Sequence, residues 1–94
     1  MPFHQTYIAG VKFRPGADEV LSKLDPGAEL SLQPEPTNPY DPNAVKVMSG
    51  TRHIGYVPKD LSADVAAKIS AGHVTGCRLK LGKVIDIEFI GDAA

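Results

Sequence analysis

The segment from residue 34 to residue 44 constrains this chain most strongly, because it cannot form a regular helix or strand. Its eleven residues include four prolines and two asparagines. Proline fixes φ and lacks a backbone N–H, and asparagine favours turns. The sequence therefore predicts a stiff loop here, with short regular elements on either side of it.

Alternation of apolar and polar residues, which places every second side chain on one face, predicts about six short strands. They are expected at Tyr7 to Phe13, Leu30 to Gln33, Val45 to Val47, His53 to Val57, Arg78 to Leu81 and Ile85 to Phe89. Turns at Ser49–Gly50 and Gly82–Lys83 join the last four of these into two hairpins.

Apolar residues at helical spacing predict two short helices. The first carries Ala17, Val20, Leu21 and Leu24, and the second, of about three turns, carries Leu61, Val65 and Ile69. With no long crossover between strands, these elements predict a mainly β, α+β fold: a curled antiparallel sheet or small barrel that hides its edges. The length fits a single domain spanning residues 1–94.

Composition and charge narrow the functional classes. Hydrophobic residues make up 43% and charged residues 22%, which is ordinary for a globular protein. No apolar run approaches the roughly 20 residues of a membrane span, and the N-terminus lacks the features of a signal peptide, so we expect a cytoplasmic protein with no membrane partner. The net charge of -1 argues against coating nucleic acid by bulk electrostatics, so any nucleic-acid site must be local.

The cations form only loose groups, Lys12 with Arg14 and Arg78 with Lys80 and Lys83. Such groups are more typical of a solvated strand face than of a binding patch.

The residues that could carry catalysis or hold a metal show no productive spacing. Cys77 lies within a strand pattern and is expected in the core, and the three histidines, His4, His53 and His73, lack ligand spacing. Asp41-Pro42-Asn43 opens like a calcium loop, but Val45 occupies the next ligand position. Neither a metal nor a cofactor is expected, and we predict that the chain is not an enzyme.

Within the proline-rich loop, Tyr40 and Asp41 stand on a rigid backbone. An aromatic ring beside an acceptor suits a nucleotide terminus, because the ring stacks on a base, worth on the order of 1–3 kcal/mol, and the carboxylate accepts a hydroxyl hydrogen bond. Alternatively, Asp41 and Asn43 cap turns and the ring of Tyr40 packs on the barrel. The loop alone leaves both interpretations open.

With these residues placed, nearly the whole chain resembles the HIRAN domain family. The resemblance rests on Ile8-Ala9-Gly10-Val11-Lys12-Phe13, on Leu32-x-x-Glu35 leading into Asn38-Pro39-Tyr40-Asp41-Pro42-Asn43-Ala44-Val45-Lys46-Val47, and on Ile54-Gly55-Tyr56-Val57-Pro58. The family occurs in fork-remodelling ATPases and as free-standing bacterial proteins.

This resemblance implies an OB-like antiparallel β-barrel with helices that captures the 3′ hydroxyl end of single-stranded DNA, and a place in DNA repair. By position, Asp41 accepts the hydroxyl, Tyr40 and Phe13 stack on the terminal base, and Asn38 supports the loop. Lys12 and Lys59 meet nearby phosphates, whose small number suits a chain without a basic surface.

Three positions differ from the fork-remodelling members. Phe13 stands where they carry a tyrosine, which keeps the stacking and removes a hydroxyl. Tyr56 stands where they carry a histidine, which removes a possible cation. Lys12 stands where they carry an arginine, which removes a two-pronged phosphate contact.

The leading hypothesis is a non-catalytic binding module for single-stranded DNA ends. The alternative is a protein-interaction or accessory domain that uses the same loop or a sheet edge to bind a partner such as a helicase or a nuclease. A third possibility, a nuclease, is disfavoured because Glu35, Asp41 and Asp86 show no spacing that places two carboxylates on one metal.

Overall fold

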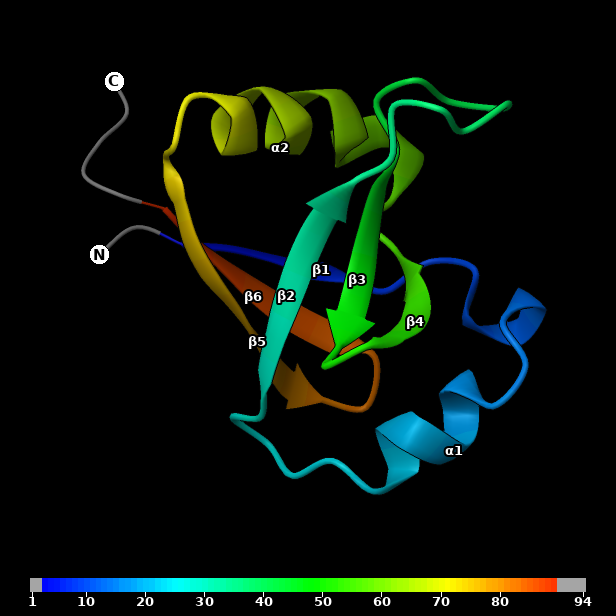
Figure 1. The fold of residues 1–94 in the computed structure, drawn as a ribbon. Coiled ribbons are helices and arrows are strands. Elements are labelled where there is room, and N and C mark those ends of the chain that lie inside the picture. The colour runs from blue at the N-terminus through cyan, green and yellow to red at the C-terminus, as the bar shows by residue number, and fades with distance from the viewer. Residues whose placement is uncertain (1–2, 90–94) are drawn as a thin grey trace.

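Six short strands curl around one core in the computed structural model, which describes residues 3–89 (Figure 1). In chain order the elements are β1 (Phe3–Tyr7), the 3-10 helix η1 (Val11–Phe13), α1 (Ala17–Ser22), β2 (Glu29–Pro34), β3 (Val45–Ser49), β4 (Arg52–Tyr56), α2 (Lys59–Ser70), β5 (Val74–Leu81) and β6 (Val84–Phe89). The strands are antiparallel and lie in the order β1-β6-β5-β2-β3-β4. The predicted curled antiparallel sheet with two helices is confirmed.

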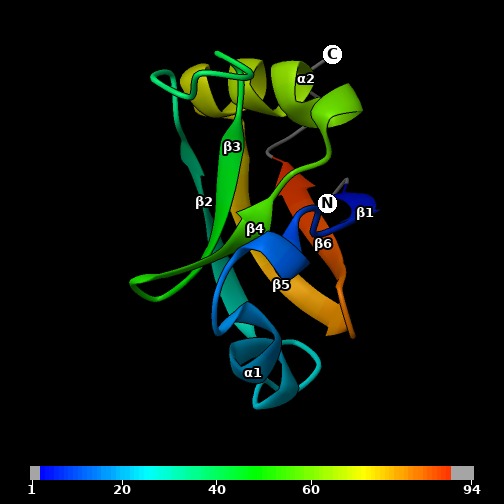
Figure 2. The ribbon, with the colours of Figure 1, turned by 90° about the vertical axis from the view of Figure 1, so that its right-hand side faces the viewer.

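The two edges of this sheet meet just beyond β1. Ala9 and Tyr56 exchange backbone hydrogen bonds of 2.8 and 2.9 Å, and in Figure 2 the blue segment after β1 lies against β4. Gly55 permits this approach, because a Cβ there would clash with the side chain of Ile8 and lie 2.7 Å from the carbonyl oxygen of Ala9. The contact brings the curled sheet close to a barrel and hides part of both edges.

Aliphatic side chains from the strands and from α2 fill the interior. The most deeply buried are Val45, Val47, Ile54, Val65, Ile85 and Ile87. α2 lies across one end of the curled sheet and α1 lies near the other (Figure 1). No helix within residues 3–89 is both long and apolar enough to cross a membrane.

Cys77 belongs to this interior, as predicted. Its side chain is 1% exposed on β5, and burial raises the pKa of the thiol to about 12. A thiol with such a pKa is protonated at neutral pH and is a poor nucleophile.

The strand predicted from Tyr7 to Phe13 is wrong. β1 ends at Tyr7, Gly10 has a φ of 72°, and the next three residues turn as η1. The left-handed angle at Gly10 interrupts an extended backbone, which the alternation of side chains does not reveal. As a result, Val11 is buried while Phe13 is 74% exposed, although a strand would have placed them on one face.

The other predicted elements are present, with shifted ends. α1 ends at Ser22, two residues before the last apolar residue of the pattern, and β5 begins at Val74, four residues before the predicted strand. The predicted loop begins at residue 34, but Pro34 is the last residue of β2 and pairs with Val45. Residues 35–44 contain no helix or strand, as their prolines predict. The predicted single domain over residues 1–94 extends beyond the residues that the structure describes.

Candidate nucleic-acid interface

The proline-rich loop is held in shape by its own side chains. The Oδ1 of Asn38 accepts hydrogen bonds from the backbone N–H groups of Tyr40 (2.8 Å) and Asp41 (3.0 Å). The Oδ1 of Asp41 accepts one from the N–H of Asn43 (2.9 Å). The bond to Asp41 is a turn-capping bond, which the second interpretation of the loop expects of Asp41.

Two buried or half-buried contacts tie the loop to the sheet and to α2. The hydroxyl of Ser62, on α2, is 1% exposed and donates to the Oδ2 of Asp41 at 2.8 Å. At the other side, the Oε1 of Glu35 accepts from the Nδ2 of Asn38 and from the hydroxyl of Tyr56, both at 2.8 Å. The loop is therefore positioned before any ligand arrives.

These contacts set the charge of the two carboxyl groups. The hydrogen bond from Ser62, then that from the N–H of Asn43 and the charge of Lys59, lower the pKa of Asp41. The hydrogen bonds from Asn38 and then Tyr56 lower the pKa of Glu35. Burial, followed by the hydrogen bond to Glu35, raises the pKa of Tyr56. At neutral pH both carboxylates are ionised and the phenol keeps its proton.

The second interpretation of the loop expects the ring of Tyr40 to pack on the barrel, and the ring does not do so. It is 87% exposed, and Phe13 on η1 is 74% exposed. Large apolar rings held in water by a rigid backbone are available for stacking.

Two adjoining hollows lie beside the loop, and the surface that contains them is named here the loop edge. The first, here named the Asp41 pocket, has a volume of about 260 Å³ and is lined on its polar side by Asp41 and Lys59. The second, the Phe13 pocket, has a volume of about 480 Å³ and is lined by Phe13, Arg14 and Glu35 among others. Gly10, Asn38, Tyr40 and Tyr56 line both.

Six of the seven predicted site residues line these pockets. Asn38, Tyr40, Asp41, Tyr56 and Lys59 surround the Asp41 pocket, and Phe13 joins three of them at the Phe13 pocket. Lys12 lines neither pocket. Its Nζ lies 5.2 Å from the centre of the Phe13 ring, a cation–π contact that places its charge beside the ring.

The structure adds Arg14 and Ser62 to the residues at this edge. Arg14 was expected on a solvated strand face, but it lines the Phe13 pocket, and its Nε is buried. No sequence signal indicates this, because its direction depends on the turn at η1. Ser62 does carry a signal: it lies three residues before Val65 on the buried face of α2, where a hydroxyl needs a partner.

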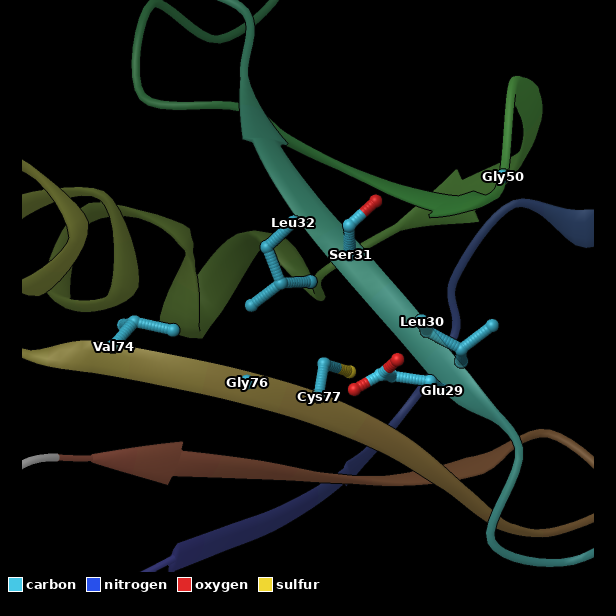
Figure 3. A pocket seen from close by; sticks show the side chains of 8 residues that line it. All are labelled: Glu29, Leu30, Ser31, Leu32, Gly50, Val74, Gly76 and Cys77. Carbon is cyan, nitrogen blue, oxygen red and sulfur yellow. The ribbon is translucent and has the colours of Figure 1, made fainter.

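Another hollow, of about 520 Å³, lies elsewhere, between β2 and β5, and is named here the β2–β5 cleft (Figure 3). The two strands pair only at Glu29 with Arg78 and at Leu30 with Cys77, and then diverge. Figure 3 shows Leu32 and Val74 on opposite sides of the gap. Among residues 3–89, no three His, Cys, Asp or Glu side chains gather as a metal site would require.

A curled sheet with a rigid polar loop and two exposed rings at one edge defines a small OB-like β-barrel binding module. Comparison with known proteins agrees, because residues 2–84 match the HIRAN domain. A stretch of 59 residues, 62% of this chain, is 41% identical to the Fanconi-associated nuclease 1 homolog of Arabidopsis thaliana, of which it covers 6%. The chain belongs to the HIRAN domain family, a family of DNA-binding modules.

Two solved structures share the fold. The HIRAN domain of human HLTF superposes with a TM-score of 0.80 over 97% of this chain and 77% of its own, at 20% identity. A protein from Lactobacillus plantarum gives a TM-score of 0.72 over 92% of this chain and 93% of its own, at 18% identity. At these identities the likeness concerns the fold alone.

Proposed function

We propose that this chain binds the end of single-stranded DNA at the loop edge, and that Asp41 accepts the hydrogen bond of a 3′ hydroxyl. The observation that carries this proposal is the pairing of an ionised, rigidly held Asp41 with the exposed ring of Tyr40 at one pocket. A sugar hydroxyl can donate to the carboxylate while the attached base stacks on the ring.

Asp41 keeps room for a further hydrogen bond although the loop already uses it. Each of its oxygens has one partner, the N–H of Asn43 on Oδ1 and the hydroxyl of Ser62 on Oδ2. An ionised carboxylate has about four acceptor positions, so each oxygen retains one. The same negative charge repels a phosphate, which makes the site selective for a free hydroxyl end.

The cations at the loop edge are few and close to the pockets. Lys59 lines the Asp41 pocket, and Lys12 lies beside Phe13. A strand end presents only a few phosphates to such a site, so a net charge of -1 is compatible with binding.

Fluorescence anisotropy with two oligonucleotides, identical except for a 3′ hydroxyl or a 3′ phosphate, tests the role of Asp41. Wild type should bind the hydroxyl-ended strand several-fold more tightly. Asp41→Asn keeps the size of the side chain and removes its charge, so it should weaken binding of the hydroxyl-ended strand and leave the phosphate-ended strand bound at least as well. Asp64→Asn, the same change on an exposed part of α2, is the matched control.

Equal binding of both strands by wild type would contradict the proposal. The alternative, that the same loop binds a protein, predicts no oligonucleotide binding at all and a protein that co-purifies through the loop. In that case Tyr40→Ala should release the partner.

A further inference from the structure

The Phe13 pocket is lined by an arginine that forms no ion pair with an acidic side chain in the described part of the chain. Arg14 follows η1 directly, is half-buried and lines the pocket. Its Nε is buried and has no hydrogen-bond partner within residues 3–89. Buried donors are paired in nearly all native structures, so an unpaired donor at a pocket needs a partner, which a ligand or a water molecule can supply.

Arg14 lines the same pocket as Tyr56, the tyrosine that both pockets share. The pKa of His53 is lowered first by burial and then by the charge of Arg14, and the same charge acts on Tyr56. The rings of His53 and Tyr56 meet edge to face with centres 4.7 Å apart. Arg14 therefore lies beside an aromatic wall and not in open solvent.

The acidic side chain that lines this pocket, that of Glu35, is largely engaged. The Oε1 of Glu35 accepts hydrogen bonds from Asn38 and Tyr56, and its Oε2 lies 4.0 Å from the Nζ of Lys46. The guanidinium of Arg14, which only donates, is thus the cationic donor that this pocket offers to the acceptors of a ligand.

A base that stacks against Phe13 or Tyr40 would direct one edge toward this donor. Guanine presents two neighbouring acceptors, O6 and N7, which match the fork of a guanidinium. Adenine presents a donor beside N7, and thymine separates its two acceptors by an N–H, so both match it less well. Among the purines, which offer the larger stacking surface, guanine is the one that fits.

We propose that Arg14 makes the Phe13 pocket a guanine-preferring subsite for a nucleotide at or next to the strand end. The proposal rests on the DNA-end function proposed above and adds a base preference to it. It assigns Arg14 to the base edge, whereas Lys12 and Lys59 meet phosphates.

The test measures anisotropy with thymidine oligonucleotides that end in a 3′ hydroxyl and carry each of the four bases at the last or the second-last position. At one of the two positions, wild type should bind guanine about fivefold or more tightly than adenine or thymine, as one good bidentate contact allows. A 7-deazaguanine, which lacks the N7 acceptor and still stacks, should lose most of this preference.

Arg14→Lys and Arg14→Gln should reduce the ratio of the affinity for guanine to that for adenine or thymine toward one. The affinity for the all-thymidine strand should change little. Arg78→Gln, at an exposed position of β5, is the matched control and should keep the preference. Equal binding of all four bases by wild type, or of guanine and 7-deazaguanine, overturns the inference and leaves DNA-end binding intact. A uniform loss across all strands in Arg14→Gln assigns Arg14 to a phosphate and also overturns it. Absence of binding to every strand refutes the proposed function itself.

Discussion

The β2–β5 cleft and the loop edge are both hollow, but their linings differ in kind. At about 520 Å³ the cleft is larger than either pocket of the loop edge, and no aromatic ring lines it. Its aliphatic lining residues are Leu30, Leu32 and Val74, of which Leu32 and Val74 lie on opposite sides of the gap (Figure 3). Its one charged lining residue is Glu29. The loop edge instead combines exposed rings, an ionised carboxylate and cations.

The difference teaches that size does not identify a nucleic-acid site in this molecule. The cleft follows from geometry, because β2 leaves β5 after two paired residues as the sheet curls. The loop edge contains side chains that do not contribute to the core. The ring of Tyr40 is one of them, because an apolar ring that stays exposed to water does not stabilise the fold by burial. Chemistry and exposure, rather than volume, distinguish the two hollows.

Tyr40→Ala should produce the largest change in DNA affinity. Loss of one stacking platform weakens binding by about 5- to 150-fold, which corresponds to roughly 1–3 kcal/mol per stacked base. Anisotropy with a hydroxyl-ended oligonucleotide measures it. Leu81→Ala removes another exposed apolar side chain, 69% exposed on β5, and should have no effect. Equal losses in both variants would show that exposed apolar area, and not the loop edge, binds DNA.

Gly55→Ala should weaken the scaffold of the loop edge. The added methyl meets Ile8 and the carbonyl oxygen of Ala9 where the sheet edges join, so we expect a loss of about 1–3 kcal/mol in the free energy of unfolding. Gly76→Ala, at the cleft, places its methyl 3.2 Å from the flexible end of Glu88 and should cost less. Urea denaturation compares the two, and a larger loss at Gly76 would contradict the described closure.

Lys59→Ala should have a moderate effect that depends on salt. Removing one phosphate contact to a single strand reduces the slope of log K against log salt by about 0.7. Anisotropy titrations at several salt concentrations give this slope. Lys80→Ala, on β5, removes an exposed lysine away from both pockets and should leave the slope as in wild type. An unchanged slope for Lys59→Ala would show that Lys59 does not contact a phosphate.

The smallest effect is expected for a thiol reagent at Cys77, which should not react in the native state. A thiol with a pKa of about 12 and 1% exposure should resist a disulfide reagent at pH 8, with or without oligonucleotide, and react fully in urea. Rapid labelling of the native protein would show that the cleft opens to solvent, which would make it a more plausible binding site than its static lining indicates.

The sequence predicts the elements whose apolar residues recur with strong periodicity. It fails where a single backbone angle determines the path of the chain. The two helices and the hairpins follow from spacing, and the stiff loop follows from its prolines. β1 escapes prediction because His4, Gln5 and Thr6 give an edge strand no apolar alternation. The left-handed angle at Gly10 then ends the extended backbone, so the directions of Phe13 and Arg14 cannot be predicted from a strand pattern.

For the candidate site, the sequence and the resemblance together find the residues of the loop and also Phe13, Tyr56 and Lys59 outside it, but they miss Arg14 and Ser62. Asn38, Tyr40 and Asp41 are adjacent in the chain, so their proximity is assured. Ser62 and Arg14 reach the same edge only through the placement of α2 and η1, which depends on tertiary packing. The dual use of Asp41, as a turn cap and as a free acceptor, also needs coordinates to be seen.

A nuclear magnetic resonance titration with a short oligonucleotide ending in a 3′ hydroxyl tests the contrast between the two hollows most directly. Amide shifts should concentrate at Phe13, Tyr40 and Asp41, while Leu32 and Val74 in the β2–β5 cleft stay unchanged. Shifts confined to the cleft, with none at the loop edge, would contradict the assignment of DNA binding to the loop edge.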